Sequence, residues 1–135
     1  MDYQEFVSRT NQAAQLKSMG RLQETVDFLY QFFLSDVSDI DKAHLCAELA
    51  AVYDRLGNTE TAITWFDKGI ELEQLYSRHE VTEKKAQYLS TLGRSRDALP
   101  IYEKLIRQPY VGEADKDRMR KVIQTLLGQT MRQWS

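Results

Sequence analysis

The residues with the greatest catalytic or metal-binding potential stand singly along this chain of 135 residues. His44 and His79 are the only histidines, and Cys46 is the only cysteine. Zinc sites usually draw their ligands from short motifs such as His-x3-His or Cys-x2-Cys, and the sequence contains neither. Carboxylate pairs such as Glu80 and Glu83 are common on solvated helix faces. We therefore expect no metal, no cofactor and no catalytic residue, and an enzyme is disfavoured.

The single cysteine also indicates a compartment. Cys46 cannot form a disulfide within the chain, which fits a reducing environment. No basic and apolar leader opens the sequence, and the longest apolar-rich run, Phe28–Leu34, is far too short to cross a bilayer. We expect a soluble, cytoplasmic protein without a membrane partner, in which Cys46 is buried and inert.

The charge argues against nucleic acid as a partner. The formal net charge is −2, whereas a nucleic-acid-binding domain is usually basic. Residues 1–41 carry three basic and seven acidic side chains, and residues 79–135 carry eleven basic and seven acidic ones. The interpretation as ordinary surface variation and the interpretation as a mild dipole that favours self-association both stay open.

Three segments of the chain repeat one another. Gly20, Gly57 and Gly93 each follow a Met or Leu, at spacings of 37 and 36 residues. An alanine stands seven residues before each glycine, and a large apolar residue stands nine residues after it. These are Ala13, Ala50 and Ala86, and then Leu29, Phe66 and Tyr102. A fixed period of this length predicts a repeated supersecondary unit.

Each unit is predicted to be a pair of helices. Apolar residues recur at steps of three and four on both sides of the glycine, and no stretch alternates as a strand would. The glycine is expected to end the first helix in a left-handed conformation. Asn58 or Thr59 would cap the next helix, and Ser38, Asp39 and Asp41 offer caps before the third. Ser77 with Glu80 predicts a capping box for the fifth helix.

A last helix is predicted after a break that contains Pro109 and Gly112. Its apolar positions recur at helical spacing and suit a helix that covers the open end of a repeat array. They are Met119, Val122, Ile123, Leu126, Leu127, Met131 and Trp134. Pro100, early in the preceding helix, is expected to cost little or to produce a kink.

The middle unit resembles a tetratricopeptide repeat. Leu49, Tyr53, Ala62 and Phe66 match the family pattern, with Ala50 in place of its glycine. The sequence departs from the pattern at Cys46, where tryptophan is usual, at Gln74, where proline is usual, and at Thr25 and Leu29 in the first unit. The resemblance implies an all-α fold of about seven helices, a right-handed α-α superhelix of antiparallel helix pairs. It places one domain over residues 1–135, with repeats at about 6–39, 43–76 and 79–109 and a capping helix at about 113–134.

The resemblance also implies a concave surface formed by the first helix of each pair, which binds a protein or peptide. The candidate binding residues are Thr10, Ala14, Lys17, His44, Ala47, Glu48, Ala51, Asp54, Glu80, Glu83, Lys84 and Gln87. One subclass of the family clamps a carboxylate with positions that correspond here to Thr10, Ala14, Glu48, Glu80 and Lys84, and only Lys84 keeps the charge this needs. Because acids outnumber lysines in the set, a basic or neutral segment is the expected ligand.

Two functions are expected to compete. The first is a non-catalytic adaptor or scaffold that binds a peptide on the concave face. The second is a self-associating assembly module that forms a homo-oligomer through its uncapped first repeat or through the capping helix. The aromatic run Phe28–Leu34 fits either a docking surface or ordinary packing of the second helix.

Overall fold

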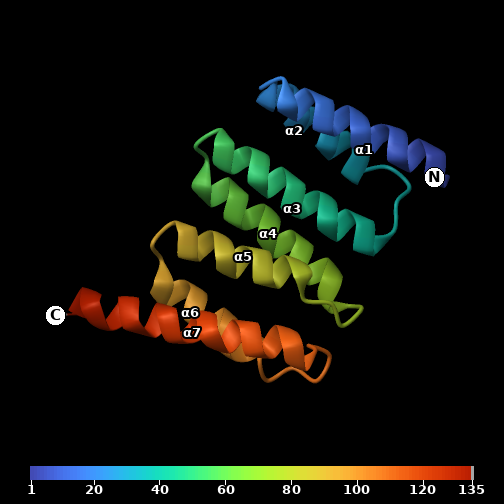
Figure 1. Cartoon of the computed structure of the whole chain (residues 1–135). Coiled ribbons are helices and arrows are strands. Elements are labelled where there is room, and N and C mark those ends of the chain that lie inside the picture. Colours follow the sequence, from blue (N-terminus) through green and yellow to red (C-terminus); the bar gives the residue numbers. More distant parts are fainter. Residues whose placement is uncertain (135) are drawn as a thin grey trace. The chain divides into compact units, whose positions relative to one another are not determined.

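The computed structural model describes the backbone of residues 1–134 and the side chains of residues 1–132. Within that part the chain forms seven α-helices and no strand, which confirms the all-α prediction and its number of helices (Figure 1). The helices are α1 (Tyr3–Ser18), α2 (Leu22–Phe33), α3 (Asp39–Arg55), α4 (Thr59–Gln74), α5 (Glu80–Thr91), α6 (Ser95–Leu105) and α7 (Glu113–Trp134). The chain divides into two compact units between Glu73 and Gln74, and each is described by itself.

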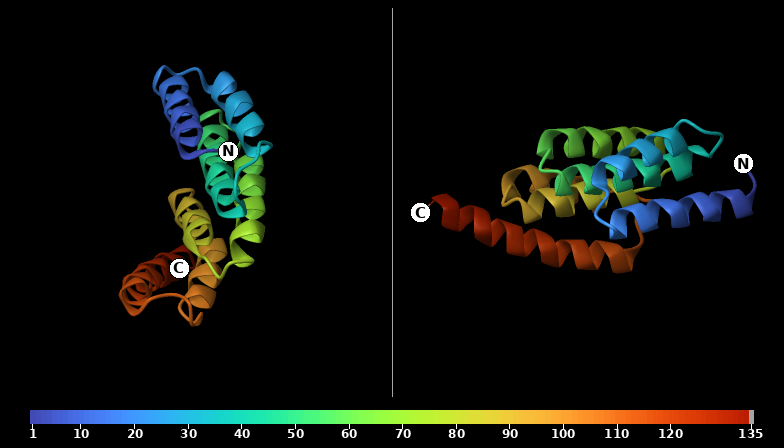
Figure 2. Two further views of the ribbon diagram at one scale, coloured as in Figure 1. Left: turned by 90° about the vertical axis from the view of Figure 1, so that its right-hand side faces the viewer. Right: turned by 90° about the horizontal axis from the view of Figure 1, so that it is seen from above.

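The first unit consists of α1 to α3 and nearly all of α4. α2 packs against both α1 and α3, and α4 lies beside α3 (Figure 2). The buried core joins three of these helices through apolar side chains spaced three or four residues apart. Its members are Ala13, Val26, Leu29, Phe32, Leu45, Leu49 and Val52. Burial of one such large apolar side chain stabilises the fold by about 1.5–3 kcal/mol, so this core holds the three helices together.

The second unit consists of α5, α6 and α7. α6 packs against both α5 and α7. Its buried core takes residues from all three helices at helical spacing. These are Val81, Ala86, Leu89, Ala98, Leu99, Tyr102, Leu105, Met119, Ile123 and Leu126. The predicted apolar face of the last helix packs at Met119, Ile123 and Leu126, but Leu127 and Met131, which were predicted on the same face, are exposed. The side chain of Trp134 lies outside the described residues.

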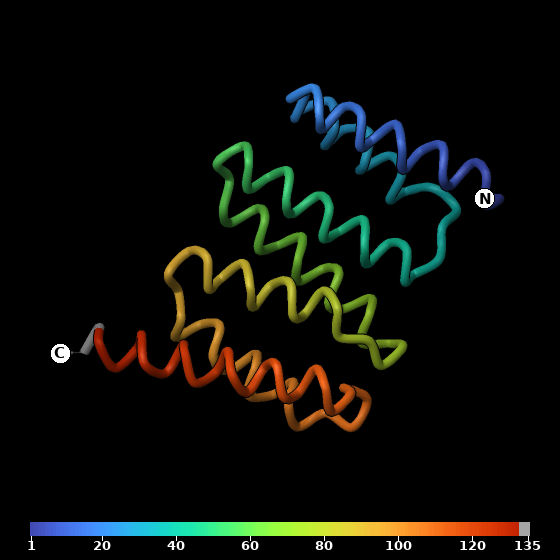
Figure 3. Tube along the Cα trace, viewed as in Figure 1, coloured from blue at the N-terminus to red at the C-terminus, as the bar shows by residue number. Residues whose placement is uncertain are grey.

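The three aligned glycines form the same joint in each helix pair (Figure 3). Gly20, Gly57 and Gly93 have φ values of +74°, +79° and +75°, the left-handed region that glycine adopts at little cost. After Gly57, the N–H of Asn58 donates to the carbonyl of Tyr53 at 2.9 Å. The equivalent bond follows each of the other two glycines, so the prediction that these glycines end helices is confirmed.

Two of the predicted caps are confirmed and one is wrong. The Asn58 side chain accepts from the N–H of Thr61 at 3.3 Å, and Ser38 accepts from the N–H of Asp41. The capping box of Ser77 and Glu80 does not form, because α5 begins only at Glu80. Ser77 instead takes a positive φ of 55° in the preceding turn, too early to cap the helix. The Glu80 carboxylate accepts from the N–H of His79 at 3.1 Å.

Alanines occupy buried positions in the helix pairs of both units. Ala50 and Ala62 in the first unit, and Ala86 and Ala98 in the second, are completely buried. A larger side chain at such a close contact would force the helices apart. Pro100 lies inside α6 on its exposed side, where the missing N–H removes one helical hydrogen bond.

Candidate functional site

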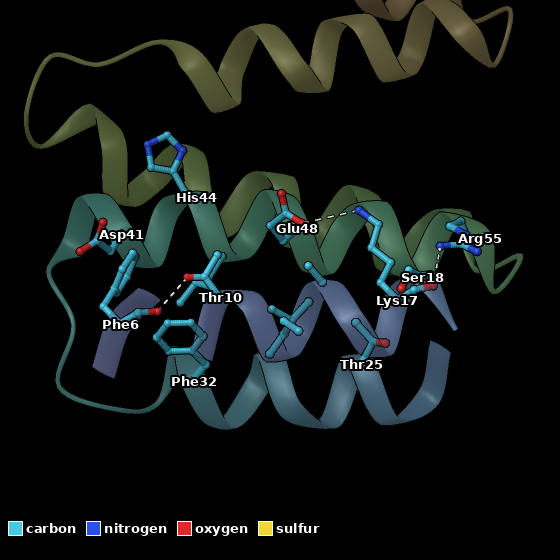
Figure 4. Close-up of a pocket in the computed structure, with 14 residues that line it drawn as sticks. Phe6, Thr10, Lys17, Ser18, Thr25, Phe32, Asp41, His44, Glu48 and Arg55 are labelled. Carbon is cyan, nitrogen blue, oxygen red and sulfur yellow. Dashed lines mark hydrogen bonds and ion pairs between the residues drawn. The ribbon is translucent and has the colours of Figure 1, made fainter. Parts of the chain in front are cut away.

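A cavity of the first unit lies between α1 and α3, above α2 (Figure 4). Its volume is about 570 Å³, within the range of sites that hold small ligands or peptide side chains. We call it the α1–α3 groove. Its residues are Phe6, Thr10, Ala13, Ala14, Lys17, Ser18, Thr25, Leu29, Phe32, Asp41, His44, Leu45, Glu48 and Arg55.

The floor of the α1–α3 groove is apolar and well packed. Leu29 and Phe32 rise from α2 and belong to the buried core. Phe6 of α1 meets Phe32 edge to face, with ring centroids 5.4 Å apart, an arrangement that aromatic pairs prefer. The one polar floor residue, Thr25, donates its hydroxyl hydrogen to the carbonyl of Arg21 at 2.7 Å. With that hydroxyl satisfied, the floor presents an apolar surface to any occupant.

Charged side chains gather at the two ends of the groove. Asp41 lies beside Phe6 at one end, whereas Lys17 and Arg55 lie at the other end (Figure 4). Lys17 Nζ lies 3.7 Å from a Glu48 carboxylate oxygen, and both side chains are substantially exposed. Such an ion pair is weak and exchanges readily with water or another partner. The rim can therefore rearrange around an incoming ligand.

Five of the twelve predicted binding residues come together in this groove. They are Thr10, Ala14, Lys17, His44 and Glu48. Ala51 and Asp54 of α3 are exposed but do not line the groove, and Ala47 is buried. The burial of Ala47 corrects the expectation that it faces a ligand. A helix turns by 100° per residue, so Ala47 lies about 60° from His44 and about 100° from Glu48 around the helix axis, at the edge of the side that they share.

The four predicted residues of α5 belong to the second unit. Lys84 and Gln87 are exposed, and Glu80 is half-buried. Partial burial raises the pKa of the Glu80 carboxyl, but backbone hydrogen bonds at Glu80 and His79, with the charges of His79 and Arg78, lower it overall. Glu83 is buried, which corrects the expectation that it faces a ligand.

Glu83 instead pairs with α7. Its carboxylate accepts two hydrogen bonds from the Arg118 guanidinium, one of them at 3.2 Å. Arg118 also donates to Asp115 at 3.1 Å, and Asp115 lies 3.6 Å from His79 Nε2. The carboxylates of Glu83 and Asp115 raise the pKa of Arg118 despite partial desolvation. α7 thus fastens to α5 through Glu83, one of the side chains that were expected to bind a ligand.

The residues with catalytic or metal-binding potential do not form a site among the described residues. Cys46 is buried, as predicted, and burial raises the pKa of its thiol to about 12, against a lowering by the charge of Lys68. The thiol is therefore protonated at neutral pH and is a poor nucleophile. Among the described residues, no three His, Cys, Asp or Glu side chains are placed to hold a metal ion. The helices in the described part are also too short or too polar to cross a membrane.

The sequence interpretation missed the floor of the groove and some of the residues at its two ends. Phe6, Asp41 and Arg55 line it but were not among the candidates. The spacing could have predicted Arg55, because His44, Glu48 and Arg55 fall on one face of a helix at steps of four and seven. Phe6 and Asp41 lie near the ends of the helices, where the choice of face depends on the packing of the neighbouring helix.

The comparison with protein-family models agrees with the structure. The model described as "Tetratricopeptide repeat" matches residues 43–74, which correspond to α3 and α4. Together with seven helices in the described residues, arranged in consecutive pairs, this match fits a protein of the tetratricopeptide-repeat type. Repeats of this type are, in general, modules for protein–protein interaction. No curated protein matches the chain.

Proposed function

We propose that this protein is a non-catalytic adaptor or scaffold module that binds a peptide segment of a protein partner in the α1–α3 groove. The observation that carries the proposal is the groove itself, an apolar cavity of about 570 Å³ with a charged rim whose Lys17–Glu48 pair is exposed. Binding sites typically combine a mostly apolar surface with a few polar groups that orient the ligand. The expected partner is a protein inside the cell, not nucleic acid and not a membrane.

The composition of the groove supports a peptide more than a compact polar metabolite. Its floor is built from aliphatic and aromatic side chains, which suits apolar side chains of a peptide. Thr10, Ser18 and His44 add hydrogen-bonding groups along the rim. Thr10 donates its hydroxyl hydrogen to the carbonyl of Phe6 at 2.9 Å, so its oxygen is oriented and can still accept from a ligand.

A peptide-display selection on the intact protein tests this proposal. Ala14 is exposed and lines the groove, so Ala14→Trp should fill the groove with little change in the core. Ala114 is exposed in the first turn of α7, and Ala114→Trp is the matched control. We expect selected peptides to lose at least tenfold in affinity for Ala14→Trp and less than twofold for Ala114→Trp. Equal binding to both variants would overturn the groove as the site.

The outer face of α1 supports a second candidate, self-association. This face carries no charged side chain and ends in Tyr3, which is 80% exposed. Its residues are Tyr3, Gln4, Val7, Ser8, Asn11, Gln12 and Gln15. A two-fold interface brings a face onto its own copy, so an uncharged face avoids repulsion between like charges. Under this alternative, a homodimer forms through α1 of the first helix pair.

Light scattering at increasing protein concentration separates the two candidates. If α1 forms a dimer, Ser8→Arg with Gln12→Arg should make the protein monomeric, because four added charges would meet across the two-fold axis. Gln31→Arg, at an exposed position of α2, adds charge elsewhere and should leave the dimer intact. A parent protein that stays monomeric at millimolar concentration would exclude this alternative.

A further inference from the structure

We propose that the occupant of the α1–α3 groove is an extended segment of about six residues, apolar in its middle, with a basic residue at one end and an acidic residue at the other. This inference rests on the proposed function and specifies its ligand. It differs from the basic or neutral ligand that the sequence favours, because the groove contains only part of the predicted surface.

The Asp41 end of the groove is negative. A second recess adjoins the groove there, since Phe6 and Asp41 line both. Asp2 and Asp36 also line this recess, and the terminal amine of Met1 lies 3.4 Å from Asp36. Three carboxylates and one amine leave a net charge of −2 at this end. A basic side chain of the occupant would be attracted to it.

The opposite end of the groove is positive. Lys17, Arg55 and Glu48 supply two positive charges and one negative charge there. One Arg55 guanidinium nitrogen lies 3.5 Å from the carbonyl of Lys17, a long contact that a carboxylate can replace. Because Lys17 already reaches toward Glu48, Arg55 is the cation best placed to pair with an acidic residue of the occupant.

The dimensions of the groove favour extended backbone. Asp41 and Arg55 are separated by 14 residues of α3, or about 21 Å along the helix axis. Extended chain covers about 3.3 Å per residue, so about six residues span the two ends. An extended segment is also narrower than an α-helix, whose diameter with side chains is about 10–12 Å.

The test is a display library of heptapeptides with five central positions restricted to Ala, Leu, Ile and Phe and with Lys, Glu or Gln at each end. The library is selected on the parent protein, and Ala14→Trp measures which binding depends on the groove. We expect peptides with opposite charges at their two ends to exceed those with like charges by about fivefold. One order of the charges should dominate, because the two ends of the groove differ in sign.

Reversal of the groove charges provides the decisive control. In Asp41→Lys combined with Arg55→Glu, the dominant order of charges in the selected peptides should invert. Asp41→Asn and Arg55→Gln should each weaken the charge preference at only one end of the selected peptides. These single variants replace the double variant as the test if the double variant does not fold. Groove-dependent peptides with no correlation between their end charges would overturn this inference and leave the groove as a peptide site. Binding that Ala14→Trp does not reduce would overturn the proposed function itself.

Discussion

The first helices of the pairs meet their neighbours in two different ways. Between α1 and α3 of the first unit lies an open groove, crossed by the exposed pair of Lys17 and Glu48 and by a long contact from Arg55 to the carbonyl of Lys17. Between α5 and α7 of the second unit the buried Glu83 carboxylate holds Arg118 in two hydrogen bonds. Similar helix pairs therefore support a surface open to ligands in one unit and a fastened contact in the other.

The difference shows that the repeat pattern alone does not decide where a ligand can bind. Glu48 and Glu83 are both acids on the first helix of their pairs, and both were expected to face a ligand. Glu48 is exposed and weakly paired, whereas Glu83 is buried beneath a guanidinium of α7. The neighbouring helix that packs on the first helix of a pair determines whether an acid on that face stays exposed or is buried in a structural contact.

The largest effects should be the same in both units, because their helix pairs are built alike. Ala50→Leu and Ala86→Leu each place extra volume at a completely buried contact and should each reduce the free energy of unfolding by about 2–3 kcal/mol. Urea denaturation measures this, with Ala51→Leu at an exposed position of α3 as the control. A loss below about 0.5 kcal/mol for either variant would show that its helix pair is not closely packed. This threshold is about the precision of a free energy of unfolding measured with urea.

A smaller effect should separate the two units. Arg118→Met leaves the Glu83 carboxylate buried without its cation, and we expect a loss of about 1–2 kcal/mol. The value is below that of a fully buried pair because Arg118 is half-exposed. Lys17→Met in the first unit should cost less than about 0.5 kcal/mol, since its pair is exposed. Arg120→Met, whose partner Asp117 is exposed on the same helix, is the matched control in α7.

Comparable losses for Lys17→Met and Arg118→Met would contradict the distinction between an open and a fastened contact. The comparison requires both variants to retain the helical circular dichroism of the parent. A larger loss for Arg120→Met than for Arg118→Met would place the important contact of α7 elsewhere.

The joints should again behave alike. Gly57→Val forces a branched side chain into the left-handed region and should cost about 1–2 kcal/mol. A Cβ atom at Gly57 or Gly93 would meet no neighbouring atom within 4 Å, so the cost is conformational and should be similar for Gly93→Val. Thermal unfolding measures both variants. A Gly57→Val protein that melts at the parent temperature would show that the left-handed joint is absent.

The smallest effect concerns pH. The folded protein lowers the pKa of Glu80, so the ionised carboxylate is favoured in the folded state. This contribution is fully present above the unfolded pKa, about 4.3, and is lost as pH falls through the lower folded value. Because the side chain is partly exposed, Glu80→Gln should cost only a few tenths of a kcal/mol at pH 7 and less at pH 3. A cost that grows on acidification would contradict this sign.

Local features of the fold were predictable, while the site was predictable only in part. The glycine joints, the buried alanines of the repeats and the buried part of the α7 face follow from spacing and residue type, whereas Leu127 and Met131 of that face are exposed. The Ser77 cap failed because the turn before α5 is longer than the motif assumes. Glu83 was misplaced because its partner, Arg118, stands 35 residues away, and spacing within one helix cannot show that contact. Phe6 and Asp41 were missed for the same reason.

The most direct test of the central claim is a backbone NMR titration of the intact protein with a peptide selected on the parent. Binding in the α1–α3 groove should shift the amide signals of Thr10, Ala14, His44 and Glu48, and these shifts should vanish in Ala14→Trp. The amides of Lys84 and Gln87 in α5 should stay unchanged. Shifts confined to α5 and α7, with the groove signals unmoved, would contradict the account.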